Sequence, residues 1–158
     1  MADVYCARCG NRISGGRKGQ LFCSSYCNYK FYHNGPLILP IKGEWFRMIL
    51  KGIKTEEYRE MKPYWEKRFE NYFGKHYSGS MKDDIGNPVA VWNGEKKDII
   101  FRNGYGKNAP EFTAECIIYE GTGKTEWGAK EGVRYYILKI LAITEKYNCD
   151  GIELEKVG

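Results

Sequence analysis

Two closely spaced pairs of cysteines constrain the first part of the chain more than any other feature. Cys6 and Cys9 form a C-x-x-C pair, and Cys23 and Cys27 form a C-x-x-x-C pair after a 13-residue spacer. Cysteines two or three residues apart on tight turns match the edge of a Zn²⁺ tetrahedron. Because four thiolates fill every position around the ion, this spacing predicts a structural zinc site rather than a catalytic one.

The residues beside these cysteines fit a small metal-held module. Gly10 follows Cys9, where a tight turn needs a residue that accepts a positive φ. Ser24 is placed to be the N-cap of a short helix that carries Cys27. Glycines in the spacer predict a hairpin tip between the two pairs. The segment is similar to treble-clef fingers of the FCS or TRASH kind, in which F-C-S-x-x-C opens the helix.

Two disulfides are the rival interpretation of the same four cysteines. Nothing in the sequence marks the chain as secreted, and paired Cys-x-x-Cys groups in a cytosolic chain favour a metal. A segment this short cannot fold on apolar burial alone, so the metal would supply most of its folding free energy. His33 is a further candidate ligand, although it also suits an ordinary position at a helix end.

Two helices are predicted on either side of a charged strand. Apolar residues between positions 44 and 53 recur at i, i+3, i+4 and i+7, which is one face of a helix, and Gly52 is placed to end it. Side chains from 55 to 61 alternate as in a strand. Pro63 then suits the first turn of a second helix with an aromatic stripe.

Four residues of this region stand in the order G-x-K-x-x-E-x-R: Gly52, Lys54, Glu57 and Arg59. Lys54 supplies a point charge or, if desolvated, a base, and Arg59 supplies a planar fork for a phosphate or a base edge. Glu57 can orient either one or relay a proton. We therefore expect the three charged side chains to converge at the mouth of a pocket. The alternative is a solvated strand with ordinary, individually weak ion pairs.

This motif and three later segments are similar, in the same order, to the ASCH domain, a relative of the PUA RNA-binding fold. The later segments are KPYWEKR at 62–68, FRNGYGKNAP at 101–110 and EWGA at 126–129. They resemble the ASCH proteins of bacteriophages and prophages, and the resemblance spans roughly residues 37–145. It implies an α+β fold, a PUA-like, partly open β-barrel of five or six strands with two or three short helices.

The segment FRNGYGKNAP holds a second group of candidates. It combines cations, amides, an aromatic ring and glycines, as a loop that approaches a base or phosphate needs. A plain turn-rich connection is the alternative. In ASCH-like proteins the corresponding loop lies near the lysine motif. The predicted nucleic-acid-binding residues are therefore Lys54, Tyr58, Arg59, Arg102, Asn103, Tyr105 and Lys107.

We divide the chain into a zinc finger (1–35), an ASCH domain (36–146) and a tail (147–158). The formal net charge is +5, and the basic residues concentrate in the first half, which is compatible with a nucleic-acid face. No signal peptide and no apolar run long enough to span a membrane is visible, so we expect a soluble, cytoplasmic protein without a membrane partner.

Three function classes stay open at this point. A module that binds RNA or another nucleic acid is preferred, with Lys54 and Arg59 at phosphates or base edges and Tyr58 or Tyr105 stacking on bases. The first alternative is an enzyme that acts on a modified nucleoside or RNA, an amidohydrolase or ribonuclease with Lys54 and Glu57 as catalytic residues. In the amidohydrolase members, however, a catalytic threonine stands at the position of Glu57. The second alternative is an adaptor that binds a protein through the finger.

Other segments carry weaker signals. The glycine-rich stretch 74–87 has no period and predicts a mobile surface loop, which could also act as a lid. Strands are predicted at 89–92, 98–102, 112–120 and 133–144, with Cys116 in the core. Cys149 falls in the polar tail as a free thiol. GTGKT at 121–125 mimics a phosphate loop, but the required earlier glycine and following apolar helix are missing, which excludes a nucleoside triphosphatase.

Overall fold

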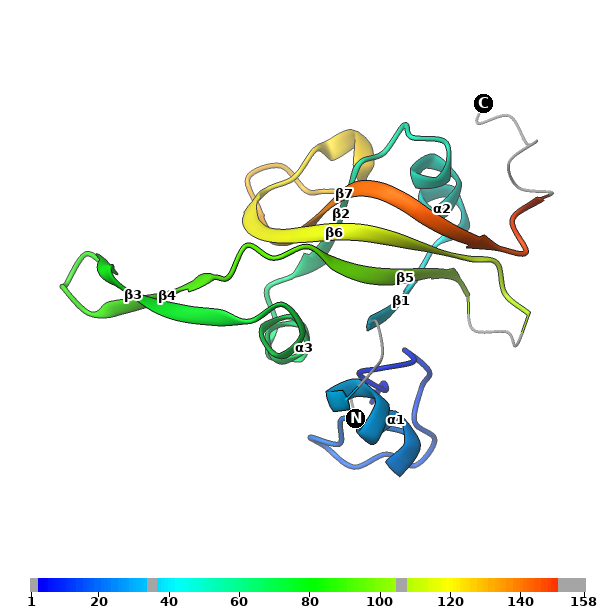
Figure 1. Cartoon of the computed structure of the whole chain (residues 1–158), viewed down its shortest axis with the longest axis horizontal. Coiled ribbons are helices and arrows are strands. Elements are labelled where there is room, and N and C mark those ends of the chain that lie inside the picture. The colour runs from blue at the N-terminus through cyan, green and yellow to red at the C-terminus, as the bar shows by residue number, and fades with distance from the viewer. Residues whose placement is uncertain (1–2, 34–36, 105–107, 151–158) are drawn as a thin grey trace. The chain divides into compact units, whose positions relative to one another are not determined.

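The computed structural model describes residues 3–33, 37–104 and 108–150. Within them the chain is α+β, with a mixed five-stranded sheet, a separate two-stranded sheet and three short α-helices (Figure 1). The chain divides into two compact units. The first comprises 1–55, 98–115 and 141–158, and the second comprises 56–97 and 116–140. No helix in the described part of the chain is both long and apolar enough to cross a membrane.

The helices are α1 (Ser25–His33), α2 (Gly43–Leu50) and α3 (Pro63–Phe73), with a 3₁₀ turn η1 (Thr125–Trp127). The strands are β1 (Leu37–Ile41), β2 (Glu56–Glu60), β3 (Lys75–Lys82), β4 (Pro88–Trp92), β5 (Lys97–Asn103), β6 (Glu111–Thr122) and β7 (Arg134–Tyr147).

The five-stranded sheet has the order β1-β5-β6-β7-β2. β1 pairs with β5 in parallel, and β2 pairs with β7 antiparallel. β1 and β2 are therefore the two edges, and the described strands form no closed barrel. The predicted α+β class is confirmed, and the finer assignment to a partly open, PUA-like barrel stays a prediction.

β6 follows the predicted alternation closely. Its buried side chains are Phe112, Ala114, Cys116 and Ile118, each two residues from the next. Successive side chains of a strand point to opposite faces, so this set lies on one face of the sheet. Cys116 is completely buried and is a core residue, as its place in the pattern indicates.

In the first unit, α2 covers the core with aromatic and aliphatic side chains. Phe46 lies 4.9 Å, centre to centre, from the ring of Phe112. The helix ends at Leu50, and Gly52 takes the positive φ of 75° that its predicted role as a helix stop requires. The predicted apolar face was one residue too long at its end. Ile53 lies beyond this stop and is 48% exposed.

In the second unit, aromatic rings join α3 to the sheet. Pro63 occupies the first turn of α3, as predicted. Phe69 is fully buried and lies 5.5 Å from both the ring of Trp65 and the ring of Tyr136. The ring of Trp92 lies 6.1 Å from Tyr136 on β7. Ring pairs at these separations stabilise a fold by more than the apolar area that they bury. This aromatic cluster therefore holds β4 and α3 on the sheet.

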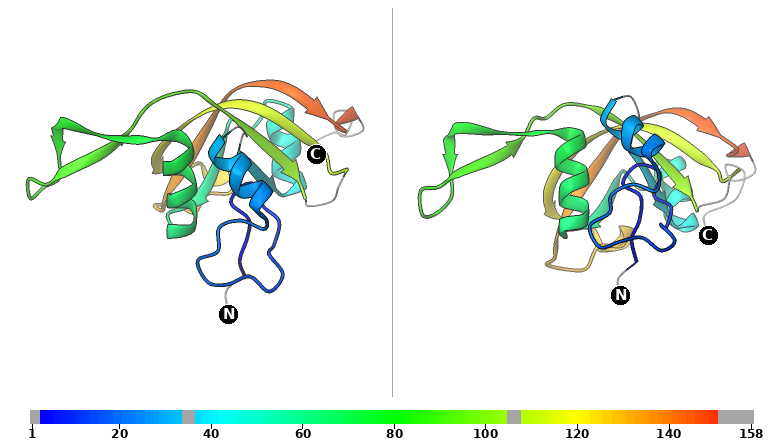
Figure 2. Two further views of the ribbon diagram at one scale, coloured as in Figure 1. Left: turned by 60° about the horizontal axis from the view of Figure 1, so that its bottom comes forward. Right: turned by 90° about the horizontal axis from the view of Figure 1, so that it is seen from below.

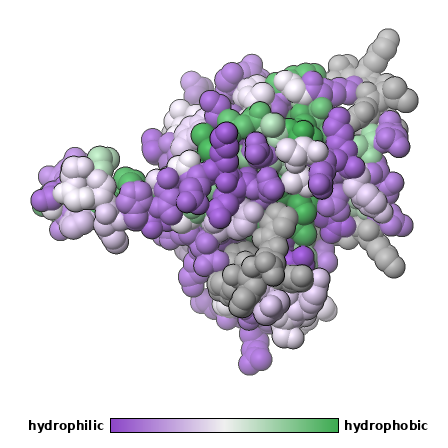
Figure 3. Space-filling view, in the orientation of Figure 1, coloured by the Kyte–Doolittle hydropathy of each residue, from purple (hydrophilic) through white to green (hydrophobic). Residues whose placement is uncertain are grey.

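The prediction of a mobile loop at 74–87 is wrong for most of that stretch. Residues 75–82 form β3, which pairs antiparallel with β4 and has an irregular register between Tyr77 and Lys82. Backbone hydrogen bonds hold this pair, while most side chains of β3 are exposed, so no apolar alternation marks the strand in the sequence. Figure 1 shows β3 and β4 extending beyond α3 as a two-stranded arm, and Figure 3 shows hydrophobic residues on the surface of this arm.

The close approach of Gly123 to Tyr58 gives a stability prediction. A Cβ atom at Gly123 would lie 2.6 Å from Tyr58 Cζ and 2.8 Å from the Cβ of Ala129. We expect Gly123→Ala to lower the free energy of unfolding by about 1–3 kcal/mol in urea denaturation, because the ring has to move. The matched control is Gly121→Ala, whose Cβ would meet Ile137 at an ordinary 3.6 Å. Equal stabilities for the two variants would contradict the prediction.

Candidate metal centre and buried charged motif

The four predicted ligands of the finger lie together. The sulfur atoms of Cys6, Cys9, Cys23 and Cys27 are all within 4.8 Å of one another. Cys23 Sγ lies 3.8 Å from Cys9 Sγ and 3.5 Å from Cys27 Sγ. A tetrahedral ion with metal–sulfur bonds of about 2.3 Å separates its ligands by about 3.8 Å. The donor set and its spacing therefore fit a four-coordinate metal ion, and the four cysteines form no disulfide.

Short-range hydrogen bonds place these sulfur atoms. Gly10, at a φ of 77°, donates its backbone N–H to the carbonyl of Cys6 at 2.9 Å and closes the first turn. The backbone N–H of Cys27 donates to Ser24 Oγ at 3.2 Å, which caps α1 as predicted. Figure 2 shows α1 together with the loops that precede it in the chain. Both local signals identified in the sequence are thus confirmed.

The electrostatics of the cluster favour a bound cation. The Cys9 thiol donates to Cys6 and lowers the pKa of Cys6 to about 4. The same hydrogen bond, together with burial, raises the pKa of Cys9, and burial raises the pKa of Cys23. One thiolate is therefore stabilised by its neighbours, while further ionisation is opposed. A dication at the centre removes that opposition, because it binds all four sulfurs as thiolates.

Lys54 lies just beyond α2, at the end of the first unit. Only 1% of its surface is exposed, and its ammonium group lies 4.5 Å from the centre of the Trp45 ring. Its backbone N–H donates to the carbonyl of Met48 at 3.1 Å, which fixes the chain as it leaves the helix. The motif lysine is thus buried against an aromatic face, a favourable site for a cation.

Glu57 and Arg59 lie on β2 in the second unit. Their side chains share one face of the strand, as predicted, and Arg59 Nη1 lies 3.2 Å from Glu57 Oε2. The Arg59 guanidinium also lies 5.2 Å from the centre of the Trp65 ring. The side chains are 6% and 14% exposed, which does not fit the solvated-strand alternative. Because Lys54 belongs to the other unit, its convergence with this pair stays a prediction.

Burial of charge is concentrated in this part of the chain. Among the described residues, the charged residues that are buried are Lys54, Glu57 and Arg68. Arg68 ends the KPYWEKR segment but was not among the site residues predicted from the sequence. Its guanidinium lies against the ring of Tyr64 and donates to the Tyr64 carbonyl. By contrast, Glu60 and Lys62 form an ion pair in which both side chains are more than 60% exposed.

Tyr58 points to the other face of β2 and belongs to a packed cluster. Its hydroxyl donates to Glu56 Oε1 at 2.7 Å and accepts from the backbone N–H of Lys124 at 2.9 Å. The hydroxyl of Tyr119 donates to the same carboxylate. Burial, more than the contact with Glu56, raises the pKa values of both tyrosines, that of Tyr119 to about 12. Tyr58 is 8% exposed, so its position is explained by packing and hydrogen bonding, and its predicted stacking on a base stays a prediction.

The second group of candidates lies at the end of β5. Arg102 Nε is 3.8 Å from Glu111 Oε1, and the backbone N–H of Asn103 donates to the carbonyl of Pro110 at 2.9 Å. Tyr105 and Lys107 lie outside the described residues. The structure therefore places Arg102 beside Glu111 and Asn103 beside Pro110, and the role of Arg102 and Asn103 in binding stays a prediction.

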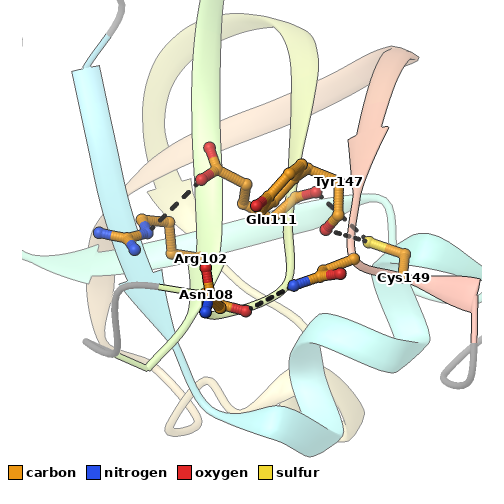
Figure 4. A network of polar contacts seen from close by, with 6 residues as sticks. Arg102, Asn108, Glu111, Tyr147 and Cys149 are labelled. Carbon is orange, nitrogen blue, oxygen red and sulfur yellow. Dashed lines mark hydrogen bonds and ion pairs between the residues drawn. The ribbon is translucent and has the colours of Figure 1, made fainter.

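Cys149 is a free thiol, as predicted, and it is buried. It is 3% exposed, and its Sγ lies 3.3 Å from the carbonyl oxygens of Glu111 and Tyr147 (Figure 4). The side-chain amide of Asn148 donates to the carbonyl of Asn108 at 2.8 Å. These contacts attach the residues after β7 to the start of β6. The polar sequence gave no sign of them, because the partners are backbone carbonyls.

Comparison of the chain with protein-family models, curated proteins and solved structures finds no match. The similarity to ASCH domains therefore rests on the motifs in the sequence. The geometry itself offers a cluster of four sulfur atoms that fits a metal ion, three buried charged residues, and the Arg59 guanidinium held by Glu57, which is the group best suited to an anion or a base edge.

The buried Glu57–Arg59 pair gives a second stability prediction. Glu57→Ala removes the carboxylate that compensates a mostly buried guanidinium, so we expect a loss of about 2–4 kcal/mol in urea denaturation. Glu60→Ala is the control on the same strand, because the ion pair between Glu60 and Lys62 is exposed. This variant should lower the free energy of unfolding by less than about 1 kcal/mol. If both variants lower the free energy of unfolding by the same small amount, the Glu57–Arg59 pair does not stabilise the fold as a buried ion pair.

Proposed function

We propose that this protein is an ASCH-like RNA-binding module of the PUA-like class, carrying a structural zinc finger. The observation that carries the proposal is the burial of Lys54 and Glu57 of G-x-K-x-x-E-x-R, with Arg59 mostly buried beside Glu57, and of Arg68 in the segment that follows. Exposed charges lie only a few residues away, so the burial is not a general property of the strand.

Burial of these charges is costly for folding and so needs another explanation. Taking an ionised group out of water costs several kcal/mol unless it is paired, and apolar residues of similar volume often stabilise a protein more. Buried charged groups concentrate at functional sites for this reason. The same segments carry the similarity to ASCH domains, so two independent observations point to one region.

Arg59 is the residue best prepared to contact a ligand. Glu57 holds its guanidinium from one side and the Trp65 ring lies beside it, so its orientation is set before binding. A planar guanidinium in a fixed orientation matches a phosphate or the edge of a guanine with two hydrogen bonds. Because Glu57 already binds Arg59, it acts here as a positioning residue, which favours binding over hydrolysis.

The metal of the finger is proposed to be zinc. A tetrahedral set of four thiolates is typical of zinc or of iron–sulfur centres, and zinc requires no redox chemistry. When bound, zinc would hold the two cysteine pairs together and neutralise half of the charge on four thiolates. The Arg8 guanidinium, 3.7 Å from Cys27 Sγ, is a donor to that sulfur from outside the tetrahedron.

The zinc proposal predicts a stoichiometry of about one ion per chain. We expect Cys9→Ser to remove the ion in elemental analysis, whereas Cys149→Ser should retain it because that sulfur contacts only carbonyl oxygens. Binding releases thiol protons, so zinc affinity in chelator competition should fall as the pH falls from about 8 to 6. Retention of zinc by Cys9→Ser, or iron in place of zinc, would contradict the proposal.

The RNA proposal is tested at Arg59 by fluorescence anisotropy with a short single-stranded RNA at several salt concentrations. We expect Arg59→Gln to weaken binding by about 5- to 100-fold, the effect of losing one two-bond contact. Lys62→Gln removes the same charge from an exposed neighbour and should weaken binding by less than about threefold. Wild-type protein that binds no RNA at low salt would overturn the proposal.

A further inference from the structure

Two large aromatic side chains are exposed on the finger helix. Tyr26 is 60% exposed and Tyr29 is 55% exposed. They stand three residues apart in α1, so their rings are neighbours on one face of the helix. A single exposed tyrosine needs no explanation. Two neighbouring rings on a module held mainly by a metal form a small aromatic platform, which we call the α1 platform.

The finger that carries the α1 platform has a net positive charge. The basic residues of the finger are Arg8, Arg12, Arg17, Lys18 and Lys30, and its only acidic residue within 3–33 is Asp3. Asp3 forms an ion pair with Arg12 at 3.2 Å. Even with the two negative charges of a zinc–thiolate centre, the segment remains cationic. The Arg8 guanidinium lies 5.4 Å from the centre of the Tyr26 ring.

We propose that the α1 platform binds single-stranded nucleic acid, with unpaired bases stacked on Tyr26 and Tyr29 and the basic residues of the finger at the phosphates. This inference rests on the proposed function and adds to it a second binding surface, built on a different part of the chain. Aromatic rings beside cations are what proteins use to hold single strands with little sequence preference. A duplex keeps its base faces stacked internally, so it cannot use the rings in this way.

The β3–β4 arm shows why charge decides the assignment. Tyr77 is 72% exposed and Ile85 is 83% exposed, so the arm displays even more apolar surface. The arm, however, carries Lys75 and Lys82 against Asp83 and Asp84, so it has no net positive charge to attract a polyanion. Exposed aromatic surface and a net positive charge occur together on the finger and not on the arm. Tyr77 therefore serves as a matched control for the tyrosines of the finger.

The test uses the full-length, zinc-loaded protein with a fluorescent oligouridine of about ten nucleotides and a duplex RNA of the same length. We expect Tyr26→Ala/Tyr29→Ala to weaken oligouridine binding about tenfold or more, with an unchanged salt slope because no charge is removed. Tyr26→Phe/Tyr29→Phe should bind as the wild type does, since it keeps both rings. Tyr77→Ala should also leave binding unchanged.

Charge variants separate stacking from electrostatics. Arg17→Gln/Lys18→Gln should weaken binding and make the slope of log K against log salt concentration shallower by about one or two. Zinc content and thermal melting show whether each variant keeps its fold. If the double alanine variant loses zinc, Tyr29→Leu replaces it, because leucine keeps apolar bulk at that position without a ring to stack on a base.

The outcomes distinguish the two proposals. If wild type binds oligouridine and Arg59→Gln weakens it, but neither Tyr26→Ala/Tyr29→Ala nor Tyr29→Leu does, the α1 platform is overturned and the proposed function stands. If loss of the tyrosines weakens oligouridine binding and Arg59→Gln leaves it unchanged, the platform is supported and the proposed Arg59 site is overturned. Equal weakening of duplex and single-strand binding by loss of the rings would overturn stacking. No binding of either RNA would overturn both proposals.

Discussion

The cost of removing charge from water shapes the central part of this protein. Glu57 and Arg59 are tolerated in a mostly buried position because they neutralise one another at 3.2 Å and because Trp65 lies beside the guanidinium. Lys54 is buried in turn against the ring of Trp45. Hydrophobic side chains of the same volume would often stabilise the fold as well or better. The proposed binding role would account for Glu57 and Arg59, and the contacts that make their burial tolerable also fix the orientation of the guanidinium.

The finger depends on a second electrostatic constraint. Four thiols packed within 4.8 Å cannot all ionise unless a cation lies between them, and a segment of this length has too little apolar surface to fold without such a bond. Both features point in the same direction, because the ion that allows ionisation also supplies the missing folding free energy. Tyr26 and Tyr29 lie on the outside of the finger, where more than half of each side chain is exposed.

Much of the fold could be predicted from the sequence, because it is governed by local periodicity. The alternation that ends in Ile118 predicts β6, and the cysteine spacing predicts the cluster of four sulfur atoms. β3 was missed because its pairing depends on backbone hydrogen bonds and leaves most side chains in solvent. Arg68 and Cys149 were missed for a related reason, since their partners are carbonyl groups that no residue pattern reveals.

The two proposed surfaces differ in the kind of recognition they allow. Arg59 is held in one orientation, so its hydrogen bonds would favour a ligand with acceptors in a matching plane and would discriminate among bases or phosphate positions. The exposed rings of the α1 platform offer stacking, which every base can accept, and the surrounding cations act on phosphates of any sequence. Recognition at Arg59 would therefore be specific, whereas recognition at the α1 platform would tolerate any sequence. Stacking on the platform requires unpaired bases, because the bases of a duplex are stacked on one another and leave no face free.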